Sequence, residues 1–465
     1  MIMSSVKQID RPSLLNPLRP LWSLTVAFVL WKSLLFLVVT ACPGPGYDTS
    51  TSLLPYLNRS PTRPAADVGV GSTLPLKFVR WDPIYFVHIV QHGYVYEQEW
   101  AFGYGFTSIW RFVASFLNPS EEVGNVAQVA WTGVGLSHLA HYLSVLALYK
   151  LSANVFGRET STQRLICFLS AALHIIAPAG AFLSAPYPEP IFSFLNIFGL
   201  YLYSSSFLDD GAGRKLPRDA KLLGAAVSFA VATTVRSNGI LSGFLFAYDA
   251  IWQLRMVLLH GLSWNVVVRL GVIVLGGCVV ALGMVLPQWV AYTTYCTTDS
   301  RPWCQWTLPS IYGWVQKQYW NVGFLRYWTV SNTPLFLLAA PMLVLLCCAS
   351  LWALKMPWAA IKERPTTVID RTMSPEDTDS LLIRLAVPQG LLALMAFTSY
   401  HVQIINRISS GYPLWYWYLV CLVVDHVGES PSAAKSNRLF AIVLQAMVVY
   451  GLIQAVLYGS FLPPA

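Results

Sequence analysis

Long apolar runs, separated by shorter polar segments, repeat along nearly the whole chain. A helix of about 20 apolar residues suffices to cross the hydrocarbon core of a bilayer. Hydropathy does not separate one kinked helix from two short ones, so several of the predicted spans are short. The eleven predicted spans lie near residues 21–41, 125–150, 165–184, 190–208, 221–236, 239–254, 268–290, 333–354, 381–402, 412–427 and 439–459. This pattern predicts an all-α polytopic membrane protein in which residues 1–465 form a single integral membrane domain.

The first apolar run has the features of a retained membrane anchor. It follows Lys7, Arg11 and Arg19, as the hydrophobic segment of a signal peptide would. The segment Cys42-Pro43-Gly44-Pro45-Gly46 comes directly after it and is not a small-residue cleavage site. We therefore expect this run to stay in the chain and to span the bilayer.

Two polar segments are long and rich in aromatic residues, namely residues 42–124 and 291–332. Trp and Tyr favour the headgroup level of a membrane, so both loops are expected to contain short helices that lie in the interface. A third polar segment, residues 355–380, has the composition of an ordinary loop.

Composition and charge support a membrane protein and predict its orientation. Of the 465 residues, 55% are hydrophobic and 11% are charged, against roughly 25% charged in a soluble domain. The net charge of +8 is weak evidence for a nucleic-acid partner, because Lys and Arg usually orient a membrane protein. With a cytosolic N-terminus, basic residues are denser in the cytosolic loops, including 355–380, than in the two aromatic loops. The bias places the aromatic loops in an organelle lumen or outside the cell.

The cysteines do not suggest a structural zinc site, because no CxxC or Cys/His ligand spacing occurs. Cys296 and Cys304 share the second aromatic loop, on the oxidising side of the membrane, where they either form a disulfide or remain free thiols. Asn58-Arg59-Ser60 is a glycosylation sequon, although Pro61 directly after it lowers the expected occupancy.

Asp82, between Trp81 and Pro83 in the first aromatic loop, is the first candidate for chemistry. A carboxylate beside an indole at a membrane surface is partly desolvated, which suits a general base. Asp followed by Pro is also a strong helix start, so Asp82 could instead be an N-cap. Both roles are compatible with the local sequence.

Further carboxylates and imidazoles follow in the same loop. Glu97 and Glu99 suit acid–base work as a pair, or are simply solvated. His88 and His92 share one face of a helix, but no third ligand stands at a fixed spacing, so a contact with a hydroxyl or phosphate is favoured over a metal. The loops also lack a DxD motif, and we expect no metal requirement.

Two polar motifs interrupt apolar helices. The segment from Ser184 to Pro190 places Glu189 between prolines, and Arg236-Ser237-Asn238-Gly239 places a guanidinium at a similar level. Ionisable residues beside broken helices usually face a cavity, although snorkelling or a structural Arg–Glu pair would also explain them. The fork of Arg matches phosphate oxygens, and four arginines are candidates: Arg236, Arg301, Arg326 and Arg407.

Several motifs follow one another in order over most of the chain. They are Arg80-Trp81-Asp82, Gly93-Tyr94, Glu97, Ala101-Phe102, the run from Ala232 to Gly239, Arg301-Pro302-Trp303-Cys304, Ile311-Tyr312, Val315-Gln316, the run from Tyr319 to Trp328, His401-Val402-Gln403, Arg407 and Tyr416-Trp417. This series resembles the PIG-V family of GPI mannosyltransferases, most specifically in the run from Trp320 to Trp328. The chain departs from the family pattern at Gly103-Tyr104-Gly105-Phe106, where the family has a Phe-Phe-Pro-rich run, and at Pro188, where it has Ser.

The resemblance implies a GT-C glycosyltransferase, with about eleven transmembrane helices and an active site at luminal loops of the endoplasmic reticulum membrane. The implied reaction moves mannose from dolichyl-phosphate-mannose to the mannosylated GPI precursor, Man-GlcN-phosphatidylinositol, and forms the second, α-1,6-linked mannose. No cofactor is implied beyond this lipid donor. The resemblance to fungal relatives also suggests a small membrane subunit as a partner.

Carried over to this chain, the motifs imply that Asp82 is the catalytic base. Glu97 and Glu189 are then expected to contact sugar hydroxyls or to orient an arginine, unless Glu97 is itself the base. The leaving phosphate is expected near Arg236, Arg326 or Arg407. The full set of expected substrate-binding residues is Arg80, Trp81, His92, Glu97, Tyr187, Glu189, Arg236, Asn238, Trp320, Asn321, Arg326, His401, Gln403 and Arg407.

Two other functions share many of these features. A lipid or sugar transporter also has many spans and broken helices, but it is expected to place charge near the bilayer midplane, whereas here the polar density lies in the aromatic loops. A GT-C relative could use the same donor on an oligosaccharide–lipid or on protein Ser/Thr. Only the resemblance around Trp320–Trp328 argues against that second alternative.

Overall fold

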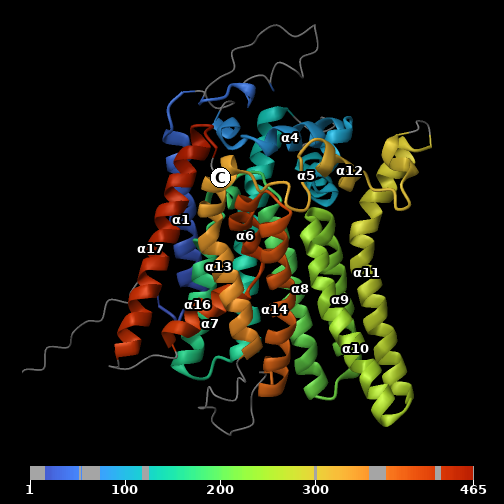
Figure 1. Ribbon diagram of the computed structural model, residues 1–465. Helices are drawn as coiled ribbons and strands as arrows, with labels where there is room; N and C mark the ends of the chain where they lie inside the picture. The colour runs from blue at the N-terminus through green and yellow to red at the C-terminus, as the bar shows by residue number, and fades with distance from the viewer. Residues whose placement is uncertain are drawn as a thin grey trace, which may run out of the picture.

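The computed structural model describes residues 16–44, 46–51, 54, 74–117, 125–297, 301–355, 373–424 and 431–463. Within these ranges the regular elements are all helices (Figure 1). The sequon at Asn58 and residues 356–372 of the predicted cytosolic loop lie outside the described residues.

A helix lies in each of the eleven ranges predicted to span the membrane. These helices are α1 (Pro20–Ala41), α6 (Val126–Phe156), α7 (Ser161–Ile175), α8 (Glu189–Gly211), α9 (Lys215–Val235), α10 (Gly243–His260), α11 (Trp264–Tyr295), α13 (Thr333–Lys355), α14 (Pro375–Thr398), α16 (Leu414–Val424) and α17 (Pro431–Gly459). Six of them, α1, α8, α11, α13, α14 and α17, are long and apolar enough to cross a membrane. The all-helical polytopic fold is confirmed, whereas a count of eleven crossings stays a prediction.

The aromatic loops form short helices, as predicted, and these gather at one end of the bundle (Figure 1). The first loop contributes η1 (Leu74–Phe78), α4 (Asp82–His92), η2 (Glu97–Ala101) and α5 (Tyr104–Leu117). The second contributes η5 (Pro302–Gln305), α12 (Ile311–Gln318) and η6 (Val330–Asn332). Helix α5 buries Phe106 and Trp110 but exposes Phe112 and Phe116. An amphipathic helix of this kind suits the membrane interface.

Two segments leave the helical path inside the bundle, which corrects the predicted boundaries. Helix α7 ends at Ile175 instead of near residue 184, and η3 (Gly180–Leu183) and a turn follow it. Helices α14 and α16 are separated by η8 (Val402–Ile404), α15 (Ile405–Ile408) and η9 (Ser409–Gly411). Prolines at 178, 186 and 188 account for the first break, because Pro disfavours a continuous helix. Residues 399–412 contain no proline, and Pro413 directly precedes α16.

Buried side chains satisfy the carbonyl groups that these breaks expose. Ser193 donates to the carbonyl of Ser410 at 3.1 Å, and Asn196 donates to that of Gly411 at 3.0 Å. Non-helical backbone at membrane depth is tolerated only where protein groups satisfy it. These bonds fix the end of the second break, and both breaks carry residues of the site described below.

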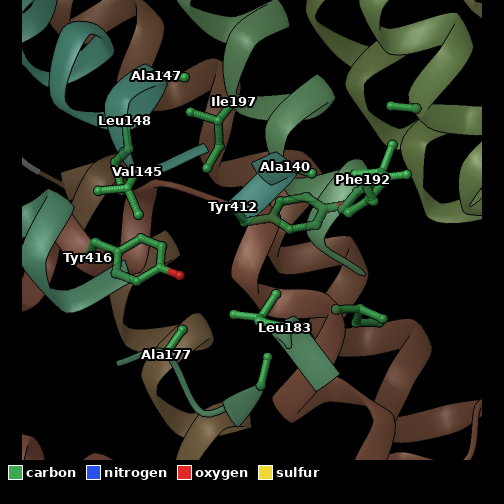
Figure 2. Packing of buried hydrophobic residues seen from close by; sticks show 14 of the residues in the cluster. Ala140, Val145, Ala147, Leu148, Ala177, Leu183, Phe192, Ile197, Tyr412 and Tyr416 are labelled. Carbon is green, nitrogen blue, oxygen red and sulfur yellow. The ribbon is translucent and has the colours of Figure 1, made fainter. Parts of the chain in front are cut away.

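Small and aromatic residues share the core between helices α6, α7, α8 and α16. Figure 2 shows small residues such as Ala140 and Ala177 among the aromatic residues Phe192, Tyr412 and Tyr416, and the ring centres of Phe192 and Tyr412 lie 6.2 Å apart. Small residues let helices approach closely where lipid supplies no hydrophobic driving force. The Tyr416 hydroxyl does not lie free in this core, because it contacts His174 Nδ1 at 2.7 Å.

Helix α5 packs unusually closely against the end of α9. A Cβ atom at Gly103 would collide with the carbonyl oxygen of Val235, and one at Gly105 would collide with the Thr234 side chain. The glycines that set this chain apart from the family pattern therefore permit the contact between the first loop and α9.

We expect the substitution Gly103→Ala to destabilise the fold, because its methyl group would meet backbone rather than a flexible side chain. Overpacking of this kind costs about 1–3 kcal/mol, so the thermal midpoint of the purified protein in detergent should fall by several degrees. Gly135→Ala is the matched control, because a Cβ at Gly135 in α6 meets nothing within 4 Å. Equal midpoints for the two variants would contradict the close packing of α5 on α9.

Candidate active site

A cavity of about 690 Å³ lies at the end of the bundle where the short helices gather. Its lining comes from segments far apart in the sequence, within 81–86, 100–104, 182–188, 233–238, 283–288, 312–322, 395–408 and 463. Both aromatic loops and both breaks in the helices therefore contribute residues to the wall of the same cavity.

Asp82 enters this cavity as the first residue of α4. Trp81, not Asp82, occupies the N-cap position, so the sequence-based N-cap alternative for Asp82 is wrong. The backbone of Trp81 has φ = 62°, a left-handed conformation that a bulky residue rarely adopts. The Asp82 side chain is 33% exposed, and its carboxylate lies 3.5 Å from the Arg407 guanidinium.

Glu189 is the buried centre of the site. One of its oxygens, Oε1, accepts from Arg407 Nε at 2.7 Å and lies 2.8 Å from Arg236 Nη1. The Glu189 side chain is fully buried, whereas the two arginines remain about one-seventh exposed, at 14% and 15%. Glu189 therefore holds two guanidinium groups side by side at the cavity wall.

Aromatic rings complete the surroundings of Arg407. Its guanidinium carbon lies 4.2 Å from the ring centre of Phe182 and 4.9 Å from that of Tyr187. Burial by itself lowers the pKa of Arg407, but the Glu189 and Asp82 carboxylates outweigh this effect and raise that pKa above its ordinary value. The side chain therefore stays charged despite its burial.

Tyr187 is a hydrogen-bond donor in this site. Burial, reinforced by the negative charge of Asp82, raises the pKa of Tyr187 well above its ordinary value. Its hydroxyl donates to the carbonyl of Arg80 at 3.3 Å, which ties the turn before α8 to the residue that precedes Trp81.

Other predicted residues line the opposite wall. His401 contacts the carbonyl of Trp320 at 2.9 Å and stacks on Tyr327 with ring centres 4.7 Å apart. Trp320 Nε1 and Gln403 Oε1 are buried and have no hydrogen-bond partner among the described residues, although both residues line the cavity. Such groups are costly unless a ligand or water satisfies them. Asn238 also lines the cavity and bonds the Tyr412 hydroxyl at 3.2 Å.

Glu97 lies outside the cavity lining, in contrast to the sequence-based expectation that it contacts substrate. Its carboxylate accepts from Trp303 Nε1 at 2.8 Å, from Trp314 Nε1 at 3.2 Å and from the Tyr319 hydroxyl at 3.4 Å. These partners belong to the second loop, so Glu97 ties the two aromatic loops together. The sequence could not show this, because the partners lie more than 200 residues away.

A disulfide joins Cys296 and Cys304 close to this tie, the first of the two alternatives that the sequence left open. Glu99 is not solvated: it is buried, lies 2.6 Å from His88 Nδ1 and accepts the backbone N–H groups of Val95 and Tyr96. Among the described residues, no three His, Cys, Asp or Glu side chains gather to hold a metal ion.

Five further expected residues do not line the cavity, and one of them, Glu189, instead bonds the two lining arginines described above. Arg80 is buried behind Trp81, with its guanidinium 4.7 Å from the ring centre of Phe461. His92 is exposed at the end of α4, and partial burial of its ring still lowers its pKa. Asn321 and Arg326 are exposed in the loop after α12. The order of motif residues along the sequence does not show which of their side chains face the cavity.

The sequence also missed several lining residues, among them Gln288, Tyr312, Gln316 and Tyr400. Gln288 accepts from the Ser310 hydroxyl at 3.1 Å and from the backbone of Tyr312 at 3.2 Å. A signal for it was present, because Pro287-Gln288 interrupts an otherwise apolar run and polar residues inside spans tend to be functional.

Comparison with known proteins adds an independent finding. The family model described as "Mannosyltransferase (PIG-V)" matches residues 22–465. The chain is 57% identical to GPI mannosyltransferase 2 of Aspergillus oryzae over all of both chains. It is 55% identical to that of Aspergillus fumigatus, over 97% of this chain and 95% of the relative, and 39% identical to that of Gibberella zeae, over 96% and 98%.

Among solved structures, an oligosaccharyltransferase of Archaeoglobus fulgidus superposes with a TM-score of 0.44 and 12% identity, over 94% of this chain and 55% of the other. The sequence relationships carry the assignment. Because the family model covers nearly the whole chain and the relatives align from end to end, the protein belongs to the PIG-V mannosyltransferase family.

Proposed function

We propose that the protein transfers mannose from dolichyl-phosphate-mannose to the 6-hydroxyl of the mannose on Man-GlcN-phosphatidylinositol. The product carries the second mannose of the GPI precursor in α-1,6 linkage. The proposed site faces the lumen of the endoplasmic reticulum, and the reaction needs no cofactor beyond its lipid donor. The observation that carries the proposal is the placement of Asp82 in one cavity with Arg236 and Arg407.

The chemistry follows from the linkages of donor and product. The donor is a β-linked mannosyl phosphate and the product is α-linked, so a single displacement inverts the anomeric carbon. Asp82 accepts the proton of the acceptor hydroxyl while the oxygen of that hydroxyl attacks the anomeric carbon. The bond from the anomeric carbon to the phosphate oxygen breaks, and its electron pair leaves with dolichyl phosphate.

One carboxylate is sufficient for this reaction. A phosphate leaving group needs no general acid, unlike the leaving alcohol in glycoside hydrolysis, which requires a second carboxyl group. The negative charge that develops on the phosphate is instead stabilised by fixed positive groups. Arg236 and Arg407 supply two such groups at the wall that also holds Asp82.

The aromatic and polar lining suits a sugar. Trp320 Nε1 can donate to a sugar hydroxyl, and Gln403 Oε1 can accept from one, since neither atom has a hydrogen-bond partner in the part of the chain that the structure describes. Trp81 presents a ring at the same cavity. The names of the relatives, GPI mannosyltransferase 2, favour a GPI acceptor over another glycan or a protein.

A transporter is the rival class, and the helices do hold buried charge that the sequence-based argument overlooked. Asp249 and Arg384, for example, lie 2.8 Å apart, and the Tyr203 hydroxyl donates to Asp249 at 2.6 Å. Both oxygens of Asp249 are thus paired within α8, α10 and α14, and none of the three residues lines the large cavity. Their arrangement therefore favours a structural role over a transport path.

The substitution Asp82→Asn should abolish transfer, because an amide cannot accept the acceptor proton. We expect the two-mannose product to fall by about 10²-fold or more, the range typical of a lost general base. The measurement uses membranes with dolichyl-phosphate-mannose and a one-mannose GPI precursor, with variants at matched expression. Glu376→Gln, in the exposed first turn of α14, is the control for loss of a carboxylate.

Retained activity in Asp82→Asn would overturn the role of Asp82 as the base. An inactive wild type would mean instead that the acceptor is different or that the small membrane subunit suggested by fungal relatives is required. Mixing wild-type membranes with a lysate of a related fungus separates these two explanations.

The two arginines are expected to determine the affinity for the donor. Arg236→Gln leaves Glu189 paired with Arg407, so the fold should survive. A hydrogen bond to a charged group contributes about 1.5–3 kcal/mol, so the KM for dolichyl-phosphate-mannose should rise about tenfold or more, with little change in the KM for the acceptor. Arg326→Gln, at an exposed arginine outside the cavity, is the matched control and should leave both values unchanged.

A further inference from the structure

Lys32, in the middle of α1, carries a buried amino group that the mechanism above does not use. Its ammonium group donates to the carbonyl of Leu183 at 2.7 Å and to the Ser184 hydroxyl at 2.9 Å. Only 5% of the residue is exposed, and the Phe28 ring centre lies 5.5 Å from Nζ. Within the part of the chain that the structure describes, no carboxylate forms an ion pair with it.

Such a lysine is unfavourable for stability. Burial removes a strongly hydrated ammonium group from water, and the two neutral acceptors compensate only in part. Replacement of buried charged groups by apolar ones of similar volume is often neutral or stabilising. A membrane helix gains nothing from a central lysine unless the contacts that it makes serve another purpose.

The acceptors of Lys32 begin the turn that builds one wall of the cavity. Phe182, next to Leu183, lies under the Arg407 guanidinium. Tyr187, three residues after Ser184, also faces that guanidinium, and Glu189 bonds both arginines. The segment from Phe182 to Glu189 has little regular structure beyond η3, so side-chain contacts fix its position.

We infer that Lys32 is a positioning residue, which anchors the segment 182–189 so that Arg407 faces the donor phosphate. The inference rests on the proposed function, since it assigns the donor phosphate to Arg407. Lys32 itself does not line the cavity and does not touch substrate. Without its two hydrogen bonds the turn would shift, and the rings and the carboxylate that orient Arg407 would shift with it.

The test compares Lys32→Met with the wild type in purified, folded protein. We expect the thermal midpoint to be at least as high as that of the wild type, because methionine is apolar and similar in length. The KM for dolichyl-phosphate-mannose should rise about tenfold, which is the effect of one hydrogen bond to a charged group. The KM for the one-mannose GPI precursor should stay within about twofold, a split that general loosening of the fold would not produce.

Lys77→Met is the matched control. The Lys77 ammonium also bonds two carbonyls, those of Thr40 at 2.6 Å and Cys42 at 2.7 Å, but it braces the end of α1 and not the turn 182–189. This variant should keep the donor KM of the wild type. Lys32→Arg, which retains N–H donors, should bring the donor KM back toward the wild-type value.

A double-mutant cycle tests the contact itself. Ser184→Ala removes one acceptor, so it should raise the donor KM by a smaller factor, and it should add little in the Lys32→Met background because interacting residues are not additive. Additive effects of the two substitutions, or an unchanged donor KM in Lys32→Met, would overturn the inference. A lower thermal midpoint together with a rise in the KM values of both substrates would also overturn it. An inactive wild type would count against the proposed function instead.

Discussion

The site depends on one buried negative charge. Glu189 is fully buried, and a carboxylate without a partner in such surroundings would be strongly unfavourable. Two guanidinium groups meet on its single oxygen Oε1, and its place in the first turn of α8 adds the favourable end of the helix dipole. This interaction brings together α8, the end of α9 and the break between α14 and α16. The cavity exists where these three elements meet.

Much of the backbone around this meeting point departs from regular helical conformation. Trp81 adopts a left-handed backbone conformation, prolines surround Glu189, and helix α7 stops short of the end of its apolar run. Strained or irregular backbone persists only where surrounding contacts hold it, and it concentrates at functional sites. Here those contacts are buried hydrogen bonds such as that of Ser193 to the carbonyl of Ser410.

Hydropathy was sufficient for the helices, and polar residues beside apolar runs were sufficient to find Asp82, Glu189, Arg236 and Arg407. The partners of these residues could not be predicted, since Arg407 meets residues 218 and 325 positions away in the sequence. For the same reason the sequence could not show that Glu97 bonds Trp303 and Trp314 of the other aromatic loop. The role of Lys32 could not be predicted either, because a lysine within an apolar run does not indicate which carbonyl its amino group contacts.

The two carboxylates of the site differ in ways that assign their roles. Glu189 is inaccessible and contributes the oxygen that two short contacts share, so it has no access to a substrate proton. Asp82 is one-third exposed toward the cavity, and its contact with Arg407 is long, at 3.5 Å. A proton acceptor must reach the hydroxyl that it activates, and of these two groups only Asp82 can do so. The same arginine bridges both carboxylates, so the group proposed to bind phosphate also fixes the distance between the proposed base and the buried charge.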